Sequence, residues 1–402
     1  MRSFRISGFV AAALLLGGLL FVMLRFPEKG LPDLPGETIS GKSDRRDREG
    51  ELSKKGLSAP AGEEPEDPSR PLALPDPGLG MELGTLQKWF GQKPDRERAL
   101  RLLQELTEKF LAADPDKASA TLLAYLRSGQ DLPTGLDFVI GEGGLEEWPS
   151  LRAFLLDLLG KVDPEEAARY ARAEVIPAKN STVEYAVSLR ILWNLGGAQE
   201  ASPELTQAWL GLLEKPDWSV RPDAAWMESM DFAGRLPSAM PVFVATATEW
   251  LAQPAASGGK AEAAQLALER AARNHPVETL GTLLQSPAWL SQGRGPGIRA
   301  SLFARADLAD SKQAEILDRY LSSLDPGSGE AMAFAKAFPY RKFSVSPGLS
   351  GFPNLQTPEE IRRSNQAAAD FFRQAVAEGR YPGLRDEIAQ IQAKLTELNN
   401  IK

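Results

Sequence analysis

The chain has one histidine able to act as a general base, His275, in the segment AARNHPVETLGTLL. A Ser-His-Asp arrangement needs one histidine to accept the proton of the nucleophile, so His275 is the only candidate for that role. It stands directly before Pro276 and a helical pattern at residues 277–285. At the start of a helix the helix dipole lowers the basicity of a histidine. We therefore expect His275 to be a weak helix cap rather than a catalytic base.

Several other kinds of chemistry lack the residues that they require. The chain contains no cysteine, which excludes disulfides, thiolate metal sites and cysteine nucleophiles. With one histidine and no H-E-x-x-H motif, it has no nitrogen and sulfur ligand set for zinc. The glycine-rich segments GEGG (141–144) and GRGPG (293–297) do not fit a phosphate-binding loop and are predicted to be ordinary loops. The sequence therefore predicts no catalytic residue, no metal, no cofactor and no enzyme.

Tryptophans and carboxylates remain as functional candidates. Six of the eight tryptophans fall within one quarter of the chain: Trp193, Trp209, Trp218, Trp226, Trp250 and Trp289. Rigid aromatic side chains often anchor a partner, so some of these are candidates to line a binding groove. The predicted partner-binding residues are Trp209, Trp218, Arg221, Trp226 and Trp250. The alternative is that the tryptophans fill gaps between helices, with the indole N–H on a carbonyl.

The elements that position these residues are predicted to be helices. After residue 80, apolar residues such as Leu103, Leu106 and Phe110 recur at spacings of three and four, which places them on one helix face. No convincing run of alternating strand residues is present. Proline suits the first helical turn, and acidic residues there complement the helix dipole. Five such helix starts are Asp114-Pro115, Asp163-Pro164, Ser202-Pro203, His275-Pro276 and Thr357-Pro358.

A further helix start is predicted at Ser181 and Glu184, which fit the capping-box pattern. The same segment, Asn180-Ser181-Thr182, is also a glycosylation sequon in a eukaryotic secretory route, which we regard as the alternative.

The spacing of the helix starts indicates repeated units. Pro115, Pro164, Pro203, Pro241 and Pro276 are separated by 49, 39, 38 and 35 residues. This pattern resembles the HEAT and armadillo class of helical repeats, whose units run about 40 to 47 residues. The resemblance covers residues 81–338 and implies an all-α, α-solenoid-like right-handed stack of helix pairs with long surfaces for partners. An irregular helical bundle is the alternative.

The amino terminus predicts a membrane anchor. Residues 6–24 form an uncharged stretch of 19 residues, close to the roughly 20 that cross a bilayer. We expect a single transmembrane signal anchor there, with residues 1–5 in the cytoplasm and the bulk of the chain outside it, in the periplasm if the source is Gram-negative. A cleaved signal peptide and a buried helix are the alternatives.

Residues 27–80 contain no aromatic side chain and few apolar ones, and are predicted to be a disordered linker. The alternative is that its charged stretch KSDRRDRE is a binding motif. The net charge of −8 and the pI near 5.1 argue against a nucleic-acid partner, which requires a cationic surface.

Two features are predicted beyond the helical-repeat domain at residues 81–338. Residues 339–356 form an aromatic loop, which either folds back along the helices as a lid or end seal, or is a partly disordered hinge. Residues 357–402 form a helical hairpin whose apolar residues follow spacings of 4, 3, 4 and 3, as in a coiled coil. This seam consists of Leu384, Ile388, Ile391, Leu395 and Leu398. It either docks on the last repeat or joins copies of the chain into a homo-oligomer.

The function that these features favour is binding. We expect a membrane-anchored scaffold that engages a protein or peptide partner in the cell envelope through its tryptophan-bearing face. The main alternative is an all-helical hydrolase of envelope polysaccharide, which needs two carboxylates about 5 to 9.5 Å apart in a tryptophan-lined cleft. A third possibility is a purely structural role in organising the envelope.

Overall fold

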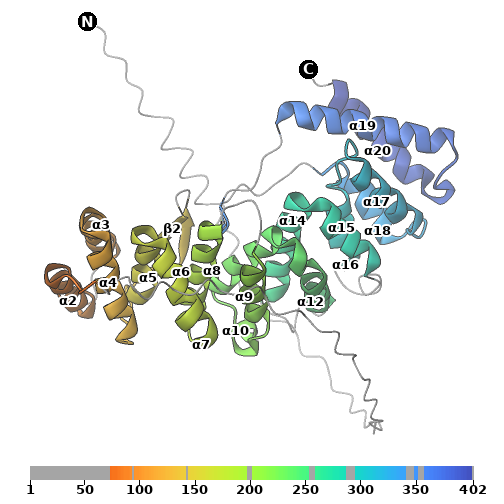
Figure 1. The fold of residues 1–402 in the computed structure, drawn as a ribbon. Helices are drawn as coiled ribbons and strands as arrows, with labels where there is room; N and C mark the ends of the chain where they lie inside the picture. Colours follow the sequence, from red (N-terminus) through yellow and green to blue (C-terminus); the bar gives the residue numbers. More distant parts are fainter. Residues whose placement is uncertain are drawn as a thin grey trace, which may run out of the picture. The chain divides into compact units, whose positions relative to one another are not determined.

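The computed structural model describes residues 73–92, 95–141, 144–196, 202–252, 259–286, 295–340, 348–351 and 357–400. The predicted anchor at residues 6–24 and most of the predicted linker lie outside these ranges. Residues 69–402 form one compact unit, which is all-α apart from a short hairpin (Figure 1). Within the described ranges, no helix combines the length and apolar character needed to cross a membrane.

The first part of this unit places each helix against helices that are near to it in the sequence. Helix α5 contacts α3, α4, α6 and α8, and α8 also contacts α6, α9 and α11. The elements are α2 (Pro77–Gly91), α3 (Arg96–Ala112), α4 (Pro115–Arg127), β1 (Val139–Gly141), β2 (Gly144–Glu147), α5 (Leu151–Val162), α6 (Pro164–Tyr170), the π-helix η1 (Ala171–Val175), α7 (Ile176–Ala178), α8 (Thr182–Gly196), α9 (Pro203–Leu213), α10 (Pro216–Val220) and α11 (Ala224–Ser229).

The second part continues in the same way. Helix α14 packs on η2, α12 and α15, while α15 packs on α17 and α16 on α18. The elements are the 3-10 helices η2 (Met230–Arg235) and η3 (Pro237–Ala239), then α12 (Met240–Ala252), α14 (Lys260–Asn274), α15 (Pro276–Gln285), α16 (Gly295–Phe303), α17 (Ser311–Ser322), α18 (Gly329–Ala337), α19 (Pro358–Ala377), the 3-10 helix η5 (Pro382–Leu384) and α20 (Arg385–Asn400).

The five predicted helix starts are confirmed. The side chains of Asp114, Asp163, Ser202 and Thr357 each accept a backbone N–H in the first turn, and Thr357 forms a complete capping box with Glu360. His275 stands at the N-cap of α15, but its side chain makes no capping hydrogen bond. Its position is therefore as predicted, but its imidazole does not cap the helix.

Three local features differ from the sequence interpretation. Helix α2 begins at Pro77 with Asp76 as its cap, ahead of the predicted start at residue 81. The segment around GEGG forms the hairpin of β1 and β2, whose three and four residues are too short to show strand alternation. At Ser181, the hydroxyl accepts the N–H of Glu184, but the Glu184 carboxylate binds Arg152 instead of completing the capping box.

The predicted C-terminal seam docks within its own chain. Leu384, Ile388, Ile391 and Leu395 are buried, and α20 contacts both α18 and α19. Leu398, the last residue of the predicted seam, is 38% exposed and is not part of this buried contact. The docking is reinforced by Lys394, whose Nζ donates to the carbonyl of Ala335 at 2.8 Å.

Candidate functional site

Two of the tryptophans predicted to contact a partner lie in the core. Trp209 and Trp226 have no exposed surface. The Trp209 indole Nε1 donates to the carbonyl of Ser229 at 2.9 Å, and its ring meets Phe243 edge to face at 5.4 Å. A side chain without exposed surface offers nothing to a partner, so the partner-binding prediction is wrong for these two residues. The core alternative, with the indole N–H on a carbonyl, describes Trp209, whereas Trp226 is buried with no hydrogen-bond partner for its Nε1.

The other members of the predicted set keep some access to solvent. Trp218 is half-buried, with its ring 5.3 Å from that of Tyr185. Trp250 is also half-buried, and its ring lies 5.6 Å from that of Trp226. Arg221 is exposed. Trp289 lies outside the described residues. Trp218 of α10, Trp250 of α12 and Arg221, just after α10, therefore remain accessible in part.

A polar groove lies where helix ends meet in the first part of the unit. Helices α5 and α8 begin at this groove, while α4 and α7 end there, and the π-helix η1 forms one wall. Its volume is about 530 Å³. Single π-turns occur often at functional sites. We call this the Arg152 groove, and the lining residues are Leu126, Arg127, Gly129, Asp131, Arg152, Tyr170, Glu174, Val175, Ala178, Asn180, Ser181 and Glu184.

The floor of the groove is an ion pair shielded from water. Arg152 donates from Nε and Nη2 to the two carboxylate oxygens of Glu184, each at 3.0 Å, and both side chains are under 15% exposed. Its Nη2 also lies 3.2 Å from the Tyr170 hydroxyl, whose pKa burial raises. Burial opposes the charge of Arg152, but the hydrogen bond and charge of Glu184 outweigh it, so the pKa of Arg152 is raised. This floor is fixed in one geometry by a two-pronged contact.

The rim of the groove carries charges that are open to solvent. Arg127 Nε donates to Glu174 Oε1 at 2.9 Å, with 55% and 39% of the two side chains exposed. Asp131 accepts the N–H groups of Leu132 and Arg152 at the start of α5. The three carboxylates of the groove therefore already accept hydrogen bonds from the protein, and no tryptophan lines it.

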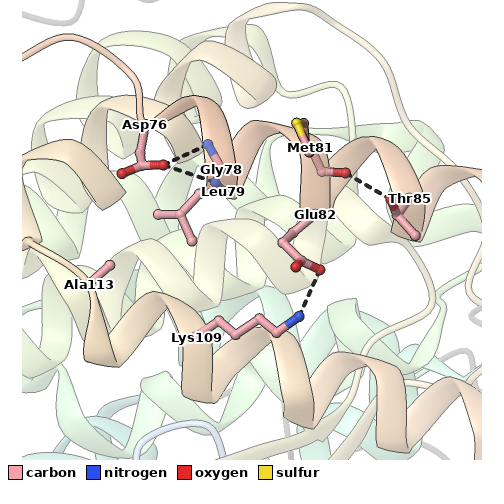
Figure 2. Close-up of a pocket in the computed structure, with 8 residues that line it drawn as sticks. All are labelled: Asp76, Gly78, Leu79, Met81, Glu82, Thr85, Lys109 and Ala113. Atoms are coloured by element: carbon pink, nitrogen blue, oxygen red, sulfur yellow. Dashed lines mark hydrogen bonds and ion pairs between the residues drawn. The ribbon is translucent and has the colours of Figure 1, made fainter.

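A second pocket lies between the first two helices (Figure 2). Its volume is about 390 Å³. Figure 2 shows Glu82 of α2 reaching Lys109 of α3, at 2.8 Å, and Asp76 turned toward the start of α2. This pocket is smaller than the Arg152 groove, and its one ion pair is exposed, without a shielded pair beneath it.

Sequence reasoning did not single out the Arg152 groove. Arg152 and Glu184 are 32 residues apart, on two different helices, and no local pattern links them. The available signals were weak ones: an isolated arginine in the first turn of an apolar helix, and a glutamate at a predicted cap.

Comparison with protein-family models, with curated proteins and with solved structures finds no match. Over the part of the chain that the structure describes, no group of three or more acidic or histidine side chains is placed to hold a metal ion.

Proposed function

We propose that this chain is a binding or scaffold protein of the cell envelope, and that its helical domain holds a segment of a protein or peptide partner in the Arg152 groove. The observation that carries this proposal is the construction of the groove, in which a shielded ion pair forms the floor and an exposed ion pair forms the rim. The shielded pair keeps the base of the groove in one geometry. The exposed pair at the rim can open, so that its two charged groups bind a ligand instead of each other.

The energies of the two pairs support this reading. The Arg127–Glu174 pair is exposed, so it contributes about 0–1 kcal/mol, and a ligand can open it at little cost. The opened pair then presents one cation and one anion. A peptide backbone and its side chains supply both donors and acceptors to such a rim, whereas breaking the shielded Arg152–Glu184 pair costs several kcal/mol more.

The architecture that we propose around the groove is a right-handed, HEAT-like stack of helix pairs. Support comes from the spacing of the proline helix starts and from the contacts between helices close in sequence. Residues 6–24 would anchor this domain in a membrane, with residues 27–72 as the tether, so that the domain lies outside the cytoplasm. Trp218, Arg221 and Trp250 are proposed as additional partner contacts. No nucleic acid or cofactor enters this proposal.

A photo-crosslinking amino acid placed at Asn180 tests the groove. Asn180 lines the groove and is exposed, so the probe points at any bound segment without disturbing the core. The matched control carries the same probe at Arg362, which is exposed on α19. We expect a cross-linked polypeptide in intact cells at position 180 and not at 362. The yield should fall when Glu174 is changed to Lys, which leaves two cations at the rim. Equal cross-linking at both positions, or none at 180, would contradict the proposal.

A further inference from the structure

Residues 348–351, which lie between α18 and α19 in the sequence, pack against elements far earlier in the chain. Phe338, just after α18, and Phe372 of α19 have ring centres 5.4 Å apart. Yet Ser350, between them in the sequence, is hydrogen-bonded to Asp231, 119 residues earlier in the chain. Long loops within compact domains are commonly functional. The contact of residues 348–351 with Asp231 therefore calls for an explanation of its own.

The detour ends in a built contact with η2 and α14. Asp231, which is 6% exposed, accepts the Ser350 N–H at 2.9 Å and the Ser350 hydroxyl at 2.5 Å, both on Oδ2. Its other oxygen accepts Arg270 Nη1 at 2.6 Å. Arg235 Nε donates to the Ser350 hydroxyl oxygen at 3.2 Å. One serine is thus held through its backbone and its side chain by two charged residues, Asp231 and Arg235, while Arg270 binds the other oxygen of Asp231.

The space around the turn and its backbone conformation restrict which residues can stand at its other three positions. At Gly348 an added Cβ would lie 2.3 Å from Asp231 Oδ2 and 2.5 Å from Arg270 Nη1, so only glycine fits. Leu349 is 2% exposed, and Gly351 has a φ of +97°, which favours glycine. Gly348 and Gly351 exchange both backbone N–H···O hydrogen bonds, which closes the turn. Each position of Gly-Leu-Ser-Gly is therefore specified by the site or by the turn.

We propose that Asp231, Arg235 and Arg270 form a binding site for polypeptide turns of the type Gly-apolar-Ser-Gly. In this structure residues 348–351 of the same chain occupy it, and the same turn from another polypeptide can take their place. Oδ2 of Asp231 accepts both donors of one serine, so the site favours a turn that supplies an N–H and an O–H donor together. The site extends the binding function proposed above but shares no residue with the Arg152 groove, so either can fail without the other.

The test supplies the turn in trans. The probe is a labelled peptide with the sequence of residues 346–353, SPGLSGFP, and its binding to the purified full chain is followed by fluorescence anisotropy. In the native chain, residues 348–351 compete with the probe for the same site. Because they are covalently attached, their effective concentration is about millimolar, so the native chain should bind the probe weakly. In Gly348→Ala the added Cβ expels the attached turn, and we expect binding at least about tenfold tighter. Gly297→Ala is the matched control, because nothing lies near an added Cβ there, and it should behave as the native chain.

Two further comparisons make the test decisive. Adding Asp231→Asn to Gly348→Ala should abolish binding, as should a probe with alanine in place of its first glycine. If Gly348→Ala does not fold, Ser350→Ala removes the hydroxyl donor to Asp231 without a clash and serves in its place. Failure of the folded variant to bind SPGLSGFP, or equal binding of the alanine probe, would overturn the proposal. Cross-linking at Asn180 is unaffected by either result.

Discussion

The Trp209→Ala substitution measures how far this tryptophan is a core residue rather than a binding residue. The whole side chain is removed from water, and its loss leaves a cavity beside Phe243 and an unpaired carbonyl at Ser229. Replacing a buried tryptophan by alanine costs about 3–5 kcal/mol. Of this, the edge-to-face contact with Phe243 accounts for about 0.5–1.5 kcal/mol. Trp209→Phe keeps most of the volume and should cost about 1–3 kcal/mol through the lost hydrogen bond.

Urea unfolding of the full chain, followed by far-ultraviolet circular dichroism, reads these values directly. At a slope of about 3 kcal/mol per molar urea, Trp209→Ala lowers the midpoint by about 1–1.7 M. Trp218→Ala is the matched control: its side chain is half-buried, so the loss should stay below about 2 kcal/mol. A smaller midpoint shift for Trp209→Ala than for Trp218→Ala would show that Trp209 is not the more buried of the two. It would then refute the assignment of Trp209 to the core.

Three further predictions concern single residues. Because the His275 side chain makes no capping hydrogen bond, His275→Asn should leave the thermal midpoint unchanged or raise stability by up to about 1 kcal/mol; a clear loss would show that the imidazole is needed. Burial raises the pKa of Glu330, so the stability that it contributes is present below its ordinary pKa and lost as pH rises through the folded value. Glu330→Gln keeps an acceptor oxygen for the Tyr320 hydroxyl but does not titrate. The stability of this variant should therefore fall less with rising pH than that of the native chain, when urea midpoints are compared from about pH 4 to about pH 8. Ile391→Ala should cost about 2–5 kcal/mol but leave the sedimentation coefficient unchanged, because the seam docks within its own chain; dissociation of an oligomer would favour the other alternative.

The features predicted well from the sequence are those with a local physical cause. A helix start needs only an acceptor before the first turn and a proline inside it, and both are adjacent in the chain. The same signal is present at Asp76-Pro77, where α2 begins, but it was overlooked because the low apolar content of residues 27–80 favoured a later boundary. Trp209 also carried a local signal: it follows Leu205 by four residues and precedes Leu212 by three, so it shares their buried face.

The features that escaped prediction depend on contacts between distant residues. Arg152 meets Glu184 only after α5 and α8 pack together, and Asp231 meets Ser350 only because residues 348–351 pack on η2. Neither residue type nor local spacing distinguishes these arginines and acids from others of the same kind. The candidate sites could therefore be found only in the folded chain.

Five of the buried and half-buried ion pairs nevertheless share one regularity, whereas Arg380–Asp318 spans 62 residues. Five arginines each bind a carboxylate that lies between 31 and 39 residues away, and most of these partners belong to different helices that pack together. The pairs are Arg152–Glu184, Arg190–Asp157, Arg270–Asp231, Arg299–Glu330 and Arg305–Glu269. These separations are close to the 35 to 49 residues between the proline helix starts, so each pair links positions about one proposed unit apart.

Shielded ion pairs contribute little net stability, because desolvation offsets much of the attraction, but breaking one by removing a partner is expensive. A helix that slips against its neighbour would leave an arginine and a carboxylate unpaired. We infer that these pairs fix the register between the packed elements that they join, a task that interchangeable leucine and alanine side chains perform poorly. On this view the Asp231 and Arg152 sites are two positions of one structural pattern: at Asp231 the second carboxylate oxygen binds a peptide turn, and at Arg152 the pair forms the floor of an open groove.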